Sequence, residues 1–154
     1  MAKIDRNLKH LTIQARNLGK EGKYKAAEEA YSLVLKKDRN NVYALVGLGD
    51  LKRQRKQFQE ALSYYQKCLE VQRDNKFALA GLGDTYRGLG QIDQALEVWR
   101  EYLSFNPGDY KVMTRGADGF RKKGTSNHPR DIIFWRWKKT KRIGLHSWAW
   151  GIFI

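Results

Sequence analysis

The chain has 154 residues, enough for one domain, and 30% of them are charged, with a mean hydropathy of −0.70. The formal net charge of +14 and the pI of about 10.0 favour an acidic partner, a nucleic acid or a membrane surface. The longest apolar-rich run, residues 143–154, is shorter than the roughly 20 residues of a membrane-spanning helix, which argues against a transmembrane segment.

The cysteine content and the N-terminus indicate the compartment. The single cysteine, Cys68, allows no internal disulfide and gives no sign of an oxidising environment. The opening residues "MAKIDRNLKH" lack the apolar core of a secretion signal. We therefore expect a cytoplasmic protein.

Two helical patterns alternate along the chain with a period of 34 residues. The first is "LKHLTIQARNLGKEG" at 8–22, and it returns as "VYALVGLGDLKRQRK" at 42–56, "KFALAGLGDTYRGLG" at 76–90 and, more faintly, "YKVMTRGADGFRKKG" at 110–124. The second is "YKAAEEAYSLVLKK" at 24–37, followed by "FQEALSYYQKCLEV" at 58–71 and "IDQALEVWREYLSF" at 92–105. The segments between units contain Asn, Asp and Pro, which suit helix ends and starts.

Small residues recur where two helices would have to approach closely. The first pattern places them at Ala15, Gly49, Gly83 and Ala117. The second places Ala27, Ala61 and Ala95 four residues before Tyr31, Tyr65 and Trp99, and residues four apart share one helix face. Gly22, Gly90 and Gly124 recur at the turn inside each unit, where a helix end favours glycine.

These residues resemble the tetratricopeptide repeat (TPR) family. The resemblance covers residues 8–124, as full repeats at 8–41, 42–75 and 76–109 and a partial repeat at 110–124, after an N-terminal extension at 1–7. It implies an all-α, right-handed superhelical solenoid of antiparallel helix pairs, with a concave groove lined by the first helices. A single pair cannot bury its apolar face, so neighbouring pairs must stack.

Three features depart from the family pattern or end it. Arg39 and Arg73 replace a proline that Pro107 supplies, and Lys52 stands at a usual tyrosine position. The partial repeat is expected to be a capping helix over the third pair that packs through Met113, Ala117 and Phe120 and frays.

The resemblance implies which residues face the groove. Four positions of each first helix do so; they are Lys9, Thr12, Arg16, Gly19; Tyr43, Val46, Asp50, Arg53; Phe77, Ala80, Asp84, Arg87; and Lys111, Thr114, Asp118, Arg121. We expect a partner-binding site made of Tyr43, Val46, Asp50, Arg53, Phe77, Ala80, Asp84, Arg87, Asp118 and Arg121. The aspartates and the arginines each form a column, and Tyr43 and Phe77 add apolar anchors, so an extended or helical peptide could bind there. Alternatively, Asp and Arg three residues apart are ordinary surface pairs or serve repeat stacking.

Other functions find less support in the sequence. The carboxylate clamp of chaperone-binding TPR proteins needs Lys, Asn, Asn, Lys and Arg, and the matching positions hold Thr12, Arg16, Gly47, Phe77 and Gly81. We find no catalytic or metal-ligating constellation among His10, His128, His146 and Cys68, and we expect Cys68 to be a buried small hydrophobe. No cofactor, metal or enzymatic activity is therefore expected. The predicted function is a protein-interaction module, a scaffold or adaptor; the alternatives are binding of RNA or another polyanion, or the regulatory fragment of a larger TPR protein.

Residues 125–154 differ from the rest of the chain. They hold four of the five tryptophans and six Lys and Arg against one acidic residue. Trp135, Trp137 and the neighbouring cations resemble a basic-aromatic nucleic-acid segment or an interfacial membrane segment. A third interpretation is that this tail is translated out of frame.

The genetic code supports the third interpretation. When the third base of each codon is joined to the first two bases of the next, Trp148–Ala149 and Trp150–Gly151 are forced to glycine, and Trp137–Lys138 is forced to glutamate. The shifted residues allow Leu-Gly-Leu-Gly-Asp, which matches "GLGD" at Gly81–Asp84 two periods upstream. We therefore expect the tail to be a disordered, out-of-frame product of a repeat array that continues.

Overall fold

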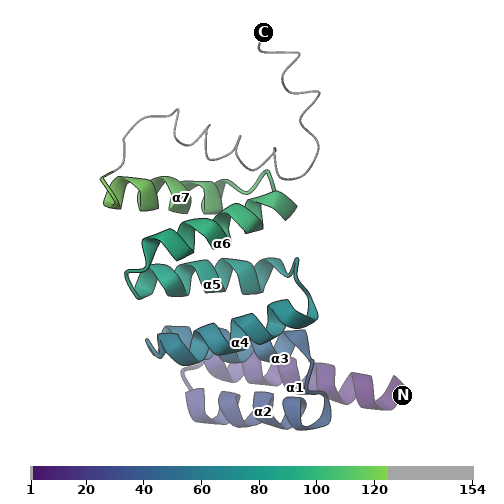
Figure 1. The fold of residues 1–154 in the computed structure, drawn as a ribbon. Coiled ribbons are helices and arrows are strands. Elements are labelled where there is room, and N and C mark those ends of the chain that lie inside the picture. The colour runs from purple at the N-terminus through teal and green to yellow at the C-terminus, as the bar shows by residue number, and fades with distance from the viewer. Residues whose placement is uncertain (1, 125–154) are drawn as a thin grey trace.

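The computed structural model describes the backbone of residues 2–124 and the side chains of residues 6–124. Over these residues it is all α-helical and has no strand. The helices are α1 (Ala2–Lys20), α2 (Tyr24–Lys37), α3 (Val42–Gln54), α4 (Phe58–Val71), α5 (Lys76–Gly88), α6 (Ile92–Phe105) and α7 (Tyr110–Lys122). They form antiparallel pairs that stack in chain order with α7 at the end, as Figure 1 shows. The expected all-α helical repeat solenoid is confirmed.

The first helix is longer than its counterparts. It begins at Ala2, before the expected first repeat residue, Leu8, and residues 2–7 contain neither glycine nor proline to stop it. Leu8 is the first buried residue among the described side chains and is 6% exposed. The sequence assigned residues 2–7 to an N-terminal extension, and in the structure they lengthen α1.

Three first helices begin at a capping side chain. The Asn41 and Asn75 side chains accept hydrogen bonds from the backbone N–H groups of Ala44 and Ala78, at 3.1 and 3.0 Å. Asp109 accepts in the same way from the N–H groups at the start of α7. Such caps satisfy amides that have no partner inside the helix, and each contributes about 1 kcal/mol. The cap residues lie in the Asn- and Asp-containing segments between the units.

The core is built from the small and aromatic residues that recur in the sequence. Ala27, Ala61 and Ala95 are fully buried, and the aromatic residues four positions later, Tyr31, Tyr65 and Trp99, are at most 4% exposed. Each ring lies against glycine backbone of a first helix, at Gly47 for Tyr31, at Gly49 and Gly81 for Tyr65, and at Gly83 for Trp99. A Cβ at any of these glycines would lie within 2.6 Å of ring atoms, so the packing requires glycine. The sequence-based prediction of small residues beside large ones is confirmed.

Lys52 stands where TPR proteins usually have a tyrosine, and it forms ion pairs with two other helices. Its side chain is 8% exposed, and its Nζ lies 2.8 Å from carboxylate oxygens of Glu28 on α2 and of Glu60 on α4. The hydrogen bonds to the two carboxylates raise the pKa of Lys52 although burial lowers it, so the amine stays charged. The bridge therefore joins the second helices of the first two repeats across α3.

The packing of α7 differs partly from the expectation. Met113 and Phe120 pack against the last core cluster, as expected. Ala117 is only half-buried, and Gly116 and Gly119 are the small residues that are buried. Gly49 and Gly83, the equivalents of Ala117, are by contrast covered by Tyr65 and Trp99 from the second helix of their own repeat. The predicted out-of-frame tail, residues 125–154, lies outside the described residues.

Candidate binding groove

A hollow with a volume of about 870 Å³ lies against the first helices of all three repeats. Its walls come from α1, α3 and the start of α5; Tyr31 in the middle of α2, the segment between α4 and α5, and the end of α6 also contribute. Its lining includes Arg16, Gly19, Lys20, Tyr31, Tyr43, Val46, Asp50, Phe77 and Phe105. Four of the ten expected groove residues, Tyr43, Val46, Asp50 and Phe77, line it; the other six, Arg53, Ala80, Asp84, Arg87, Asp118 and Arg121, do not.

Exposed aromatic side chains border the hollow. Tyr43 and Phe77 are 66% and 62% exposed, although a large apolar ring is usually buried. The ammonium of Lys76 lies 5.1 Å from the centre of the Phe77 ring. Phe105, at the end of α6, is 46% exposed and lines the same hollow. Sequence reasoning missed Phe105 because it lies on a second helix, whereas the groove was assigned to first helices.

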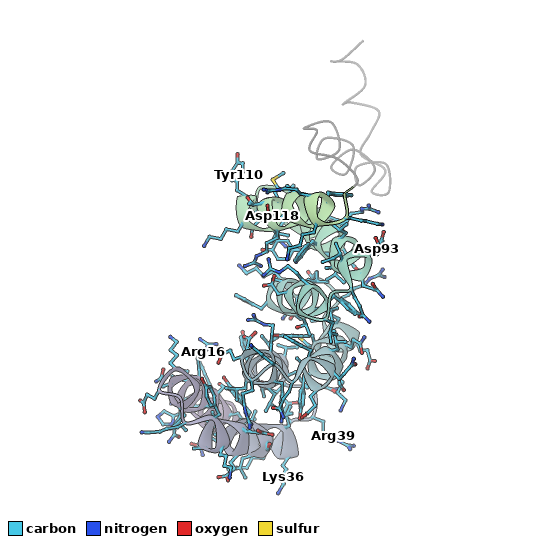
Figure 2. All side chains as sticks on the ribbon, turned by 90° about the vertical axis from the view of Figure 1, so that its left-hand side faces the viewer. Arg16, Lys36, Arg39, Asp93, Tyr110 and Asp118 are labelled. Atoms are coloured by element: carbon cyan, nitrogen blue, oxygen red, sulfur yellow. The ribbon has the colours of Figure 1, made fainter. Side chains whose placement is uncertain are left out.

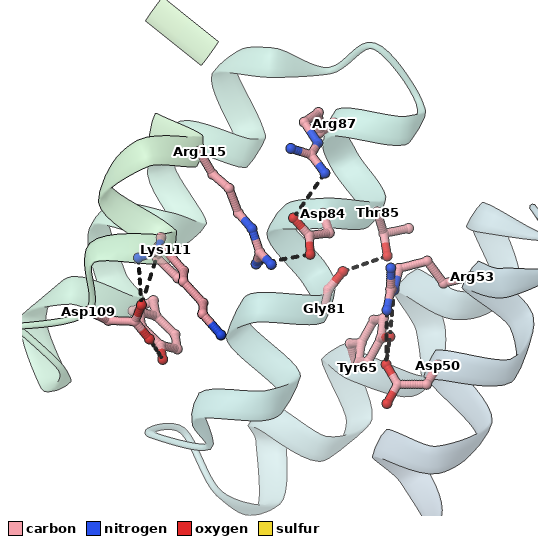
Figure 3. A network of polar contacts seen from close by, with 12 residues as sticks. Asp50, Arg53, Tyr65, Gly81, Asp84, Thr85, Arg87, Asp109, Lys111 and Arg115 are labelled. Carbon is pink, nitrogen blue, oxygen red and sulfur yellow. Dashed lines mark hydrogen bonds and ion pairs between the residues drawn. The ribbon is translucent and has the colours of Figure 1, made fainter. Parts of the chain in front are cut away.

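The first Asp–Arg pair is closed by a tyrosine of the next helix. The Tyr65 hydroxyl donates to Asp50 Oδ1 at 2.6 Å and accepts from Arg53 Nε at 3.3 Å, and Arg53 Nη2 lies 3.5 Å from the same Asp50 oxygen (Figure 3). Burial and the Asp50 carboxylate raise the pKa of the Tyr65 hydroxyl, so it remains a donor. Burial lowers the pKa of Arg53, but its contacts with Tyr65 and Asp50 more than compensate. Asp50 therefore lines the hollow while already paired with Arg53 and Tyr65.

The second pair contacts Arg115 of α7, which the sequence placed on the polar outer face of the last helix and not in the groove. Asp84, whose side chain is 11% exposed, lies 3.5 Å from Arg87 and 3.0 Å from Arg115 of α7 (Figure 3). The guanidinium of Arg87 also lies 5.8 Å from the Trp99 ring centre. Asp118 and Arg121 form the third pair. The alternative interpretation, in which the Asp and Arg side chains of the first helices pair with each other, therefore matches their contacts in the structure. The contact from Arg115 to Asp84 in addition joins α7 to the preceding repeat.

Three cationic side chains that line the hollow have no carboxylate partner among the described residues. Within the described part of the chain, Arg16, Lys20 and Lys76 line the hollow and form no ion pair. Burial raises the pKa of Tyr31, and the Arg16 guanidinium beside its hydroxyl offsets part of the rise. Figure 2 shows Arg16 and Tyr110 on the concave side of the stack, and Lys36 and Arg39 on the opposite side.

Comparison with known proteins identifies the repeats. The family model described as Tetratricopeptide repeat matches residues 42–106. Residues 42–106 carry tetratricopeptide repeats. A search of the curated proteins finds no significant match.

Solved TPR structures share the fold. The first TPR of Spaghetti (RPAP3), bound to the HSP90 peptide SRMEEVD, has a TM-score of 0.73 and 17% identity, over 77% of this chain and 94% of that one. MamA has a TM-score of 0.75 and 19% identity, over 88% of this chain and 80% of that one. The Arabidopsis OM64 TPR domain has a TM-score of 0.70 and 15% identity, over 75% and 96%. At these identities the similarity establishes the fold alone.

The TPR positions that would form a carboxylate clamp are occupied by other groups. Gly47 and Gly81 lie against the rings of Tyr31 and Tyr65, where an added Cβ would come within 2.3 and 2.4 Å of ring carbons. The Thr12 hydroxyl donates to the Lys9 carbonyl at 2.7 Å. An amide or guanidinium side chain at either glycine would displace a core tyrosine, so these two positions cannot supply polar groups to a ligand.

Residues 6–124 also bear on other chemistry that the sequence raised. Cys68 is a free, fully buried thiol whose pKa burial raises to about 11, which agrees with its expected role as a small hydrophobe. In this range no three His, Cys, Asp or Glu side chains gather as a metal site would require. Among the described helices, none has the length and apolar character needed to span a membrane.

Proposed function

We propose that this TPR array is a non-enzymatic, cytoplasmic interaction module that binds a peptide segment of a partner protein in the concave hollow. The observation that carries the proposal is the exposure of Tyr43 and Phe77, which both line a hollow of about 870 Å³. Exposed rings beside a concave surface are typical of binding sites, because their burial by a partner releases water from apolar surface. The peptide-bound TPR of similar fold supports the choice of a peptide as ligand.

The internal pairing of the arginines assigns different roles within the proposed site. The side chains of Tyr43 and Phe77 are already exposed and can contact a ligand directly. Arg53 and Arg87, which the sequence suggested as ligand contacts, would have to exchange an internal carboxylate for one on the ligand. Such an exchange gains little free energy, because one ion pair replaces another. We therefore place the main contribution to affinity on the two aromatic residues.

The same pairing argues against RNA as the principal ligand. Lys52, Arg53, Arg55, Arg87, Arg115 and Arg121 each contact a carboxylate of the protein. Polyanion binding depends on cations that are free to neutralise phosphates, and its affinity falls steeply with salt. A peptide held mainly by Tyr43 and Phe77 would instead lose far less affinity than a polyanion when salt is raised.

Selection from a library of random peptides displayed on phage tests the proposal. The protein is used as bait beside the variant Tyr43→Ala/Phe77→Ala. We expect the protein to enrich a family of peptides and the variant to bind them about tenfold more weakly or worse, since truncated aromatic anchors typically cost at least that much. Measuring affinities at low and moderate salt separates peptide from polyanion binding.

The matched control is Ile13→Ala/Leu33→Ala. These two apolar side chains are 47% and 49% exposed and do not line the hollow, so their loss should leave the affinity unchanged. Equal binding by the protein and the Tyr43→Ala/Phe77→Ala variant would overturn the proposed site. Enrichment that disappears at moderate salt in every peptide would favour the polyanion alternative.

A further inference from the structure

The charge of the hollow is unevenly compensated. Arg16, Lys20 and Lys76 line it without an ion pair among the described residues, whereas Asp50 is held by Arg53 and Tyr65. The other lining carboxylate, Asp74, is exposed and forms no ion pair among these residues either. The lining therefore holds three uncompensated cations and one uncompensated carboxylate, and such a surface attracts negative charge.

Two of the three cations occupy a different wall from the aromatic rings, whereas the Lys76 ammonium lies 5.1 Å from the centre of the Phe77 ring. Arg16 and Lys20 belong to α1, while Tyr43 and Phe77 lie near the starts of α3 and α5. A ligand that fits both walls carries acidic side chains toward α1 and apolar side chains toward α3 and α5. Guanidinium–carboxylate contacts of this kind are charge-assisted and directional.

The repeat geometry suggests a spacing for the apolar side chains. Tyr43 and Phe77 are equivalent residues of two first helices that pack on each other, α3 and α5. Packed helices have axes roughly 8–10 Å apart. A polyproline II peptide advances about 3.1 Å per residue and repeats its facing side chain every third residue, a step of about 9 Å. Apolar side chains three positions apart on an extended peptide therefore match one ring per repeat.

We propose that the hollow selects an internal, extended peptide segment with an excess of Glu and Asp and two apolar residues three positions apart. This inference rests on the proposed function and adds the chemistry of the ligand to it. The carboxylates pair with Arg16 and Lys20, and the apolar side chains cover Tyr43 and Phe77. No free C-terminal carboxylate is needed, because acidic side chains within the segment supply the charges that pair with Arg16 and Lys20.

The peptides recovered from the phage library test this chemistry. Displayed peptides are internal segments, so a terminal carboxylate cannot be the feature selected. We expect the enriched family to be acidic with the stated apolar spacing. A synthetic copy of the enriched sequence, amidated at its C-terminus, should lose at least about tenfold in affinity when its acidic residues become amides, and a similar factor toward the protein variant Arg16→Gln/Lys20→Gln.

The control variant, Lys36→Gln/Arg39→Gln, removes the same charge from the opposite side of the stack, where Figure 2 shows both residues. It should change the affinity less than twofold, because exposed charges farther than a Debye length, about 10 Å, are screened. Circular dichroism of each variant checks folding. The amide-substituted peptide tests the same contacts on the intact protein.

The outcomes separate the two proposals. An enriched family that is neutral or basic, or an affinity unaffected by Arg16→Gln/Lys20→Gln, would overturn the acidic-ligand inference and leave peptide binding in the groove intact. The absence of any enrichment over the Tyr43→Ala/Phe77→Ala variant would overturn both.

Discussion

Lys56 adopts the backbone conformation that glycine adopts in the other units. Its φ of 58° lies in the left-handed region, as do those of Gly22, Gly90 and Gly124 at 79°, 76° and 70°. The N–H of Lys56 bonds to the Arg53 carbonyl at 3.0 Å, so the turn closes as it does at Gly22 and Gly90. The period of 34 residues predicts this turn, but only the structure shows that a lysine accepts the conformation.

We predict that Lys56→Gly stabilises the protein. A left-handed residue with a Cβ costs roughly 1–2 kcal/mol, and part of the gain is offset because glycine loses more backbone freedom on folding. The expected net gain is about 0.5–1 kcal/mol, visible as a rise of roughly 2–5 °C in Tm. Lys56→Ala is the control and should give no gain, since alanine keeps the Cβ. Equal shifts for the two variants would show that lost lysine contacts, and not the backbone, cause the effect.

At the scale of the helix, the sequence predicted the second helices to the residue. The patterns at 24–37, 58–71 and 92–105 coincide with α2, α4 and α6. This succeeded because a repeated pattern averages out local ambiguity, and because each of these helices packs on two neighbours. The arrangement of α7 was less predictable. Burial of Gly116 and Gly119 instead of Ala117 depends on which helices surround α7, and a single helix sequence does not carry that information.

The site was predicted only in part for a similar reason. The period places Tyr43 and Phe77 correctly on the wall of the hollow. It cannot show that Tyr65 closes the Asp50–Arg53 pair or that Arg115 reaches Asp84, because both contacts depend on side-chain geometry between helices. Nor does a pattern on first helices identify Phe105, which reaches the hollow from the end of α6.

The attachment of α7 should depend on the ionised carboxylate of Asp109. This group accepts a hydrogen bond from the Tyr102 hydroxyl at 2.5 Å and from the N–H groups of Lys111 and Val112. These contacts, the Tyr102 bond foremost, lower the pKa of Asp109 below 3.8 and outweigh the effect of burial. Because the folded-state pKa is depressed, the stabilisation is complete above the ordinary value and is lost as the pH falls through the lowered one.

We therefore predict that Asp109→Ala loosens α7 by about 1–2 kcal/mol, which is the size of a cap plus one hydrogen bond. Hydrogen exchange of the α7 amides at neutral pH should accelerate about tenfold, while α3 and α4 stay protected. Asp118→Ala, on the same helix but outside the cap, serves as control. Fraying of this last helix was also expected from sequence, and α7 amides as slow as those of α4 in the unaltered protein would contradict it.

At the scale of the whole molecule, the sequence beyond Gly124 poses a separate question. The forced codons predict that a neighbouring reading frame continues the repeats, with glutamate and glycine at the expected phase. Reading all frames of the coding DNA across Gly124 tests this. If a neighbouring frame continues the array, the half-buried Ala117 gains the helix that covers its equivalents. If none does, membrane and nucleic-acid binding by residues 125–154 become the leading questions.

The hollow belongs to no single repeat, since its walls come from α1, α3 and α5. In a solenoid each repeat contacts only its neighbours, so small changes of angle at the two junctions add up along the stack. The distance from Arg16 to Phe77 is therefore set by the curvature of the array and not by the internal geometry of any helix. A force that straightens the array would separate the charged wall from the aromatic one. Extension of the array would then lower its affinity for a ligand.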